Sequence, residues 1–306
     1  MNEIFAHIVF ADYGGQTTRR AAFAAEPVTA EGVKGFLVRL PITGAEAAGD
    51  KVGAVGMLQR ALDALANQGV DIVLQPEGLA ADVKGMAVAR GADIMPFLLP
   101  RAAKKALAAI GKEFARCEIA VLCEDATVAA QVLGEMGPMA NFMTLAGAHD
   151  RLDALRETAA GIYRETGLEA VLSEDMRQAV SRADVVIHTA PPQSAYANLY
   201  KRGCVSLDLS GSRGMTASLL ARRPDITAAD GLYVSMGKTT FPQDVLALAL
   251  YGKSDACARL VREGYTPETA VLVRRDLAQL RVTVAAFAQA GRALSMSGLA
   301  RRAMNR

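Results

Sequence analysis

The sequence contains no apolar run long enough to cross a lipid bilayer, and it lacks the marks of an export signal. A membrane-spanning helix needs about 20 consecutive apolar residues, and no segment of the 306-residue chain approaches that length. Its first residues, Met1–Ile4, are not a basic region followed by an apolar stretch. We therefore expect a cytoplasmic protein with no membrane partner.

The chain also has little net charge and few cysteines. A formal net charge of +2 leaves no basic surface of the kind that binds nucleic acid. The cysteines form no C-x-x-C pair and have no histidine nearby at ligand spacing, so the sequence predicts neither a metal site nor a disulfide. They are Cys117, Cys123, Cys204 and Cys257.

Strand-like and helix-like segments alternate along the chain, which is typical of an α/β protein. The length and the hydrophobic fraction of 51% suit two modest domains. We expect a doubly wound, parallel, Rossmann-like sheet in residues 116–252. A smaller α/β domain is expected in residues 1–115, joined by helices in 253–306 that pack back across the junction.

The first hundred residues show one clear helix and several strands. Asp50 can cap a helix to Gln68, with a stripe of apolar residues and Gly69 to end it. The stripe comprises Val52, Val55, Leu58, Leu62 and Leu65. Strands are expected at 4–11, 35–40, 70–74 and 92–97, and a basic helix at 101–116 is the expected connector between the domains.

The second part of the chain is more regular, because its βα spacing is short throughout and favours a parallel sheet. A helix beginning at Thr266, with Pro267 in its first turn, is expected to run to about Ala290. Expected strands lie at 118–123, 142–146, 169–172, 184–188, 205–209 and 231–235.

The junction after the first of these strands differs from an ordinary dinucleotide-binding loop. Such a loop carries G-x-G-x-x-G, whose glycines let a diphosphate approach the free N–H groups of the following helix. Here the six residues Cys123–Val128 include no glycine and two carboxylates, Glu124 and Asp125. Either a cofactor contacts Glu124, Asp125, Ala126 and Thr127, or Asp125 simply caps the helix and nothing binds there.

Residues 118–240 nevertheless resemble the nucleotide-binding domain shared by shikimate dehydrogenases and glutamyl-tRNA reductases. The segments that carry the resemblance are Ala183–Pro191, Cys204–Ser210 and Asp230–Ser235. The resemblance implies a two-domain fold of the amino-acid-dehydrogenase type and NAD or NADP as cofactor. The first 116 residues, however, lack the paired serines and the catalytic Lys and Asp of shikimate dehydrogenases, and the nucleophilic Cys of glutamyl-tRNA reductases.

The N-terminal part is similar in short stretches to the methylene-tetrahydromethanopterin dehydrogenases. These stretches are Asp12–Gly15, Val28-Thr29 and Gly49–Lys51. The phosphate loop is the feature at which this chain departs from all three families.

Ligands of open parallel sheets bind at the carboxyl ends of the strands. His149, Asp150 and Arg151 lie where a ribose contact is expected, and the alternative is that Asp150 caps the next helix. The other expected cofactor contacts follow later strands: Thr189, Ala190, Pro191, Ser210 and Gly237.

Two residues are candidate proton donors. His188 ends an apolar strand and has a side chain suited to proton transfer near neutral pH, although a satisfied structural histidine is the alternative. Lys51 is the other candidate. Tyr13, Gly14 and Gly15 follow the first strand and are candidate substrate contacts.

Two hypotheses remain open. The chain is either an NAD(P)-dependent oxidoreductase acting on a small polar metabolite in an interdomain cleft, or a silent or repurposed relative that binds no dinucleotide. Its partner is expected to be a small molecule, and the apolar C-terminal segments are compatible with a homodimer.

Overall fold

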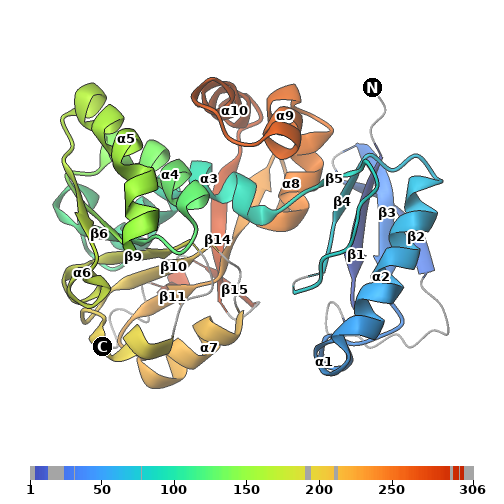
Figure 1. Ribbon diagram of the computed structural model, residues 1–306, viewed down its shortest axis with the longest axis horizontal. Helices are drawn as coiled ribbons and strands as arrows, with labels where there is room; N and C mark the ends of the chain where they lie inside the picture. Colours follow the sequence, from blue (N-terminus) through green and yellow to red (C-terminus); the bar gives the residue numbers. More distant parts are fainter. Residues whose placement is uncertain are drawn as a thin grey trace. The chain divides into compact units, whose positions relative to one another are not determined.

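The computed structural model describes residues 4–12, 24–30, 32–76, 78–189, 194–209, 213–289, 292–295 and 297–299. The chain forms two compact units, and each unit is built from two separate segments of the sequence (Figure 1). The first comprises Met1–Gly91 with Asp244–Ala278, and the second Ala92–Gln243 with Gln279–Arg306. Within the described ranges, no helix combines the length and the apolar character that a membrane crossing needs.

The first unit is built on a five-stranded sheet. In the order β2-β3-β1-β4-β5, only the β2–β3 pair is antiparallel. The strands are β1 (Phe5–Val9), β2 (Ala24–Ala30), β3 (Val33–Arg39), β4 (Ile72–Leu74) and β5 (Ala87–Val88). The helices are α1 (Gly44–Gly49), α2 (Lys51–Ala66), α8 (Gln243–Tyr251), α9 (Asp255–Glu263) and α10 (Pro267–Gln279).

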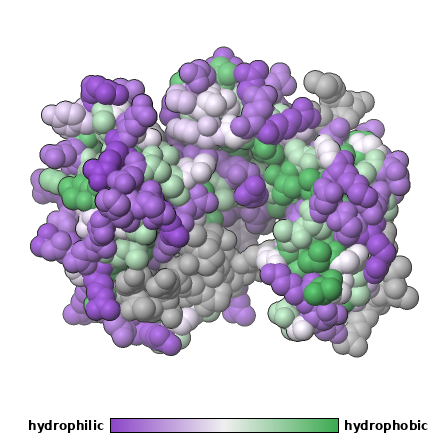
Figure 2. Space-filling view, in the orientation of Figure 1, coloured by the Kyte–Doolittle hydropathy of each residue, from purple (hydrophilic) through white to green (hydrophobic). Residues whose placement is uncertain are grey.

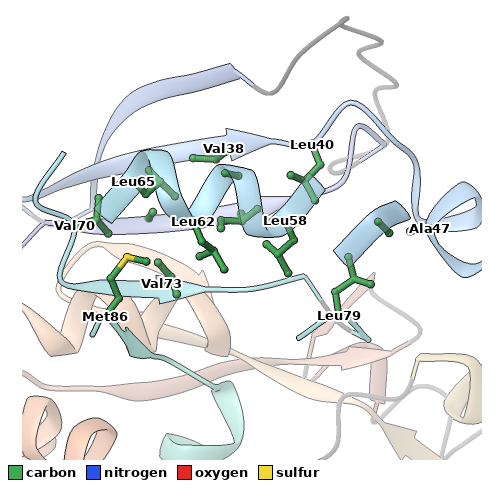
Figure 3. Close-up of a cluster of buried hydrophobic side chains, with 14 residues drawn as sticks. Val38, Leu40, Ala47, Leu58, Leu62, Leu65, Val70, Val73, Leu79 and Met86 are labelled. Atoms are coloured by element: carbon green, nitrogen blue, oxygen red, sulfur yellow. The ribbon is translucent and has the colours of Figure 1, made fainter. Parts of the chain in front are cut away.

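Helix α2 confirms the clearest sequence prediction for this unit. The Asp50 carboxylate accepts the N–H of Gly53 at 2.9 Å and caps the helix. One face of the helix packs on the sheet, and its buried leucines are Leu58, Leu62 and Leu65 (Figure 3). Val52, expected in the same stripe, is 86% exposed, so it does not belong to the buried face.

The second unit contains a six-stranded parallel sheet in the order β11-β10-β9-β6-β7-β8. Its strands are β6 (Glu118–Leu122), β7 (Phe142–Ala146), β8 (Ala170–Ser173), β9 (Val185–His188), β10 (Val205–Asp208) and β11 (Thr227–Ala229). Counted along the chain, this is the order 3-2-1-4-5-6 of the doubly wound, dinucleotide-binding fold. The expected fold class is thereby confirmed.

Helices cover both faces of this sheet (Figure 1). Helices α4 (Ala126–Met136) and α5 (His149–Thr166) lie on one face and contact each other. On the other face α6 (Met176–Arg182), the 3-10 helix η4 (Ser194–Leu199) and α7 (Arg213–Arg222) share an apolar cluster with the sheet. The outer surface around α5 is mostly hydrophilic (Figure 2).

Two predicted elements are wrong because a third sheet uses them. Residues 231–235 do not form the sixth parallel strand, which is β11. They belong to β12 (Gly231–Met236), in an antiparallel sheet of order β13-β12-β14-β15. Its other strands are β13 (Thr239–Pro242), β14 (Thr283–Gln289) and β15 (Arg292–Ser295).

The predicted long C-terminal helix is therefore also incorrect beyond Gln279. Thr266 caps it as expected, its hydroxyl accepting the N–H of Thr269 at 3.1 Å. The helix stops at Gln279, and Arg281 takes a left-handed backbone conformation with φ 52°. The apolar residues that follow bury themselves in a strand against β12, a partner that local sequence does not reveal.

The strand predicted at 92–97 is instead the start of α3 (Gly91–Ala109), which runs to Ala109 with Pro96 and Pro100 inside it. Proline inside a helix costs about 3 kcal/mol because an N–H donor is lost. Here a nearly continuous buried face offsets that cost, through Ile94, Met95, Leu98, Leu99, Ala102, Ala103, Ala106 and Leu107. The expected connector is thus the second half of a longer helix, followed by the 3-10 helix η2 (Phe114–Arg116).

Candidate functional site

The order of strands reverses between β6 and β9 of the parallel sheet. From β6 the chain continues outward to β7 and β8, whereas from β9 it continues outward to β10 and β11 on the opposite side. In folds of this kind, ligands bind beyond the carboxyl ends of the strands at such a reversal. The residues that leave β6 and β9 there are Cys123–Asp125 and His188-Thr189.

The N-terminus of α4, where a diphosphate would bind, is occupied by the protein's own carboxylate. Asp125 is the N-cap, and its Oδ1 accepts the N–H groups of Thr127 at 2.9 Å and Val128 at 3.0 Å. The N–H of Asp125 donates to the Thr189 hydroxyl at 3.0 Å, and that hydroxyl donates to the Leu122 carbonyl at 2.7 Å. The prediction that Asp125 caps this helix is confirmed.

Glu124 lies next to this cap in an unfavourable environment. Its side chain is half-buried, and both of its carboxyl oxygens are shielded from solvent without a hydrogen-bond partner among the described residues. The pKa of Glu124 is raised to about 7, mainly by burial and to a smaller extent by the Asp208 carboxylate, while the residue's own backbone N–H and Arg151 partly oppose the shift. Near neutral pH, Glu124 is therefore close to half protonated.

His188 is the last residue of β9 and is completely buried, with 0% exposure. Its Nε2 is 2.7 Å from the hydroxyl of Tyr200, whereas its Nδ1 has no partner among the described residues. Burial lowers the pKa of His188 to about 3, so the ring is neutral at physiological pH. Its role as a proton donor stays a prediction, and this environment argues against it.

Arg223 fixes the segment that carries Tyr200. Its guanidinium donates to the carbonyls of Ala197 at 2.9 Å and Tyr200 at 2.8 Å, and it forms an ion pair with Asp225 at 2.7 Å. These contacts hold η4 and the following turn against the end of α7. The Tyr200 hydroxyl is thereby placed on the imidazole of His188.

The predicted ribose contacts lie at the start of α5, one strand away. His149 sits between two carboxylates, with Nδ1 2.9 Å from Glu174 and Nε2 3.2 Å from Asp153. The alternative expectation that Asp150 caps α5 is wrong: the N-cap is Ala148, without a side-chain bond, and Asp150 is an exposed residue of the first turn. Arg151 is half-buried and acts electrostatically on Glu124.

Gly147, which follows β7, is required by the close approach of β6. A Cβ at this position would lie 3.1 Å from the Cβ of Cys123 and 3.2 Å from its carbonyl oxygen. Glycine here allows the carboxyl ends of the two strands to come together. The chain thus keeps a glycine at the end of its second strand although it has none in the phosphate loop.

The remaining predicted residues either belong to elements other than the parallel sheet or lie outside the described residues. Lys51 is the exposed first residue of α2 in the first unit. Gly237, with φ +62°, is a turn residue between β12 and β13 of the antiparallel sheet, so its expected place after a sixth parallel strand is wrong. Outside the described residues lie Tyr13, Gly14, Gly15, Ala190, Pro191 and Ser210.

The four cysteines are free and buried, and burial raises the pKa of Cys123 to about 12, so this thiol stays protonated. In the part of the chain that the structure describes, no three His, Cys, Asp or Glu side chains lie together so as to hold a metal ion.

Two residues of this region were not predicted. Tyr200 follows η4 and gives no local signal. Asp208 is 1% exposed at the end of β10, and a carboxylate between Leu207 and Leu209 was a signal that sequence reasoning could have used.

No protein-family model matches this chain, and no curated protein matches it. Among solved structures it is similar to quinate dehydrogenase from Corynebacterium glutamicum in complex with NAD, with 15% identity and a TM-score of 0.37 over 90% of this chain and 99% of the other. It is also similar to shikimate 5-dehydrogenase from Listeria monocytogenes in complex with shikimate and NAD, with 10% identity and a TM-score of 0.34 over 89% and 96%. A shikimate dehydrogenase in complex with NADP+ gives 12% identity and 0.37 over 91% and 96%.

These structures include dehydrogenases of the kind that the sequence resembles. Similarity at this level does not extend to activity or ligands. The class of the second unit follows from its own strand order, which is that of a Rossmann-type α/β domain.

Proposed function

We propose that the second unit is a repurposed Rossmann-type domain. It binds a small molecule at the carboxyl edge of its parallel sheet, but it does not hold the diphosphate of NAD or NADP on α4. The observation that carries this proposal is the Asp125 carboxylate on the N–H groups of Thr127 and Val128. Those are the groups that a bound diphosphate would need.

The free energies involved favour exclusion. Displacing the cap would break two hydrogen bonds to a charged acceptor, worth about 1.5–3 kcal/mol each. If Asp125 stayed in place, its contact with a diphosphate would cost about 1–4 kcal/mol. Either route weakens a dinucleotide by several kcal/mol, and each 1.4 kcal/mol is about a factor of ten in affinity.

Isothermal titration of the purified protein with NAD+, NADH, NADP+ and NADPH tests this proposal. We expect no measurable heat with the natural chain. We expect binding to emerge when Glu124 and Asp125 are both replaced by glycine. Asp175→Gly is the matched control, because Asp175 caps α6 in the same manner through the N–H of Gln178 at 2.9 Å. Tight binding of any of the four cofactors by the natural chain would contradict the proposal.

A second candidate is favoured by the strand order itself. The chain would then be an NAD(P)-dependent oxidoreductase acting on a small polar metabolite, with the nicotinamide near Thr189 and Lys51 or His188 as proton donor. This candidate predicts binding by the natural chain. It also predicts that the glycine variants leave the affinity unchanged or lower, so one titration series separates the two functions.

A further inference from the structure

Buried polar side chains gather at the carboxyl edge of the sheet, and two of them carry atoms with no hydrogen-bond partner among the described residues. His188 pairs across the sheet with Leu122 of β6 on one side and with Asp208 of β10 on the other. Neighbours in register point to the same face, so His188 and Asp208 share one face. Glu124 lies two residues beyond Leu122, at the end of the adjacent strand.

Two of these residues present atoms without a hydrogen bond among the described residues. They are Nδ1 of His188, whose side chain is completely buried, and both carboxyl oxygens of Glu124. A buried polar group without a partner costs about 1–3 kcal/mol, and more when it is charged. Leaving three such atoms at the place where Rossmann-type folds bind ligands indicates that a ligand completes the site.

The charges around Glu124 indicate the chemical class of that ligand. Arg151 on α5 favours the ionised form, Asp208 on β10 opposes it, and both Glu124 and Asp208 act on the Tyr200 hydroxyl after η4. The neighbouring His188 is neutral and contributes no positive charge. Among the described residues around Glu124, two carboxyl groups stand against one guanidinium, which leaves this part of the site short of positive charge and of hydrogen-bond donors. A ligand that brings an ammonium group supplies both.

We infer that Glu124 is a ligand-binding residue, and that it takes the ammonium group of a small organic amine at the carboxyl ends of β6, β9 and β10. This inference rests on the proposed function, because it requires that the end of α4 holds no diphosphate. An organic cation fits better than a metal ion, since no group of three ligating side chains lies together among the described residues.

Binding is coupled to a proton. In the free protein near pH 6, Glu124 is mostly the neutral acid, since its pKa is about 7. When the ammonium group binds, Glu124 releases its proton to solvent, and the resulting carboxylate accepts hydrogen bonds from the ammonium N–H groups. One proton leaves for each amine bound, and no bond to carbon changes.

Calorimetric titration with the diamine putrescine tests the inference. Butanediol, which carries hydroxyl groups in place of the ammonium groups, is the uncharged control ligand. Performed at pH 6 in two buffers of different ionisation enthalpy, the putrescine titration should show release of close to one proton per putrescine. The affinity should rise about tenfold between pH 6 and pH 8, as expected for a group that titrates near pH 7. Butanediol should not bind.

Glu124→Gln should abolish both putrescine binding and proton release. Glu157→Gln, at an exposed position on α5, is the control and should retain both. The inference is overturned if the natural chain does not bind putrescine, if it binds without releasing a proton at pH 6, or if Glu124→Gln binds equally well. The buffer comparison needs only the natural chain, so it remains decisive even if the variant fails to fold. Dinucleotide titration of the same sample reports on the proposed function separately.

Discussion

Replacement of Glu124 by glutamine should stabilise the protein at alkaline pH and change it little at acidic pH. The pKa of this carboxyl is raised from 4.5 to about 7 in the folded chain. A carboxyl with a raised pKa lowers the free energy of unfolding as the pH rises from the unfolded value through the folded one. A difference of about 2.5 between the two values corresponds to roughly 3 kcal/mol at 1.36 kcal/mol per unit.

Water reduces that figure, because the side chain is only half-buried. After allowance for screening we expect about 1–2 kcal/mol. Glu124→Gln should therefore gain about this much over the natural chain between pH 5 and pH 8. Glutamine is nearly isosteric, has no charge to desolvate, and so should show no such dependence.

Urea denaturation followed by circular dichroism at pH 5, 6, 7 and 8 measures the effect, with Glu157→Gln as the control. The quantity to compare is the difference in unfolding free energy between variant and natural chain at each pH. A difference that stays constant with pH would refute the reasoning, because Glu124 would then be as well solvated in the folded state as in the unfolded one. A difference that falls with pH would refute it as well.

Two further predictions concern groups away from Glu124. Asp184 is held by Lys112 at 2.7 Å and Lys201 at 2.9 Å, and although burial raises its pKa, the hydrogen bonds from these lysines lower it more. Asp184→Asn should cost about 1–3 kcal/mol at pH 7 in urea denaturation. That difference should shrink as the pH falls below the ordinary aspartate pKa of about 4, because the unfolded chain then takes up a proton more readily than the folded carboxylate, whose pKa is lowered; a difference independent of pH would contradict the ion-pair explanation. Tyr200→Phe should cost about 1–3 kcal/mol by leaving the second nitrogen of His188 unpaired as well, and a thermal melt identical to that of the natural chain would contradict this.

Five of the six strands of the parallel sheet could be predicted from sequence, because they are short apolar runs at the βα spacing that favours a parallel sheet. The sixth, β11, was not predicted. Asp125 illustrates the success: an acidic residue between the strand and the helix predicts a cap, and the carboxylate does accept the N–H groups of Thr127 and Val128.

The antiparallel sheet could not be predicted, because its strands are brought together from distant parts of the chain. Val284 pairs with Val234, fifty positions earlier, and without that partner the apolar residues of β14 are compatible with a helix. The first half of α3, predicted as a strand at 92–97, was missed for the opposite reason. Pro96 and Pro100 are strong local signals against a helix. The burial of the apolar face of α3 in the folded chain outweighs the cost of these two prolines.

Part of the candidate site could be predicted from sequence: Glu124 was identified, but the pairing of His188 with Tyr200 was not. Glu124 was recognised because it stands where glycine is expected. For His188 the sequence left open a proton donor and a structural histidine, whereas complete burial keeps the ring neutral. Its partner Tyr200 lies twelve residues further on, and only the folded chain shows that the two meet.

The interleaving of the two units has a consequence for how the protein is made. The second unit begins at Ala92, is interrupted after Gln243, and is completed only by residues that follow Ala278. Until a ribosome has released β14, strand β12 has one side without its hydrogen-bonding neighbour. An unpaired strand edge can form hydrogen bonds with a strand of another chain. A nascent or prematurely terminated chain is therefore most prone to aggregate through Gly231–Met236. Chaperone capture during synthesis should concentrate on that stretch.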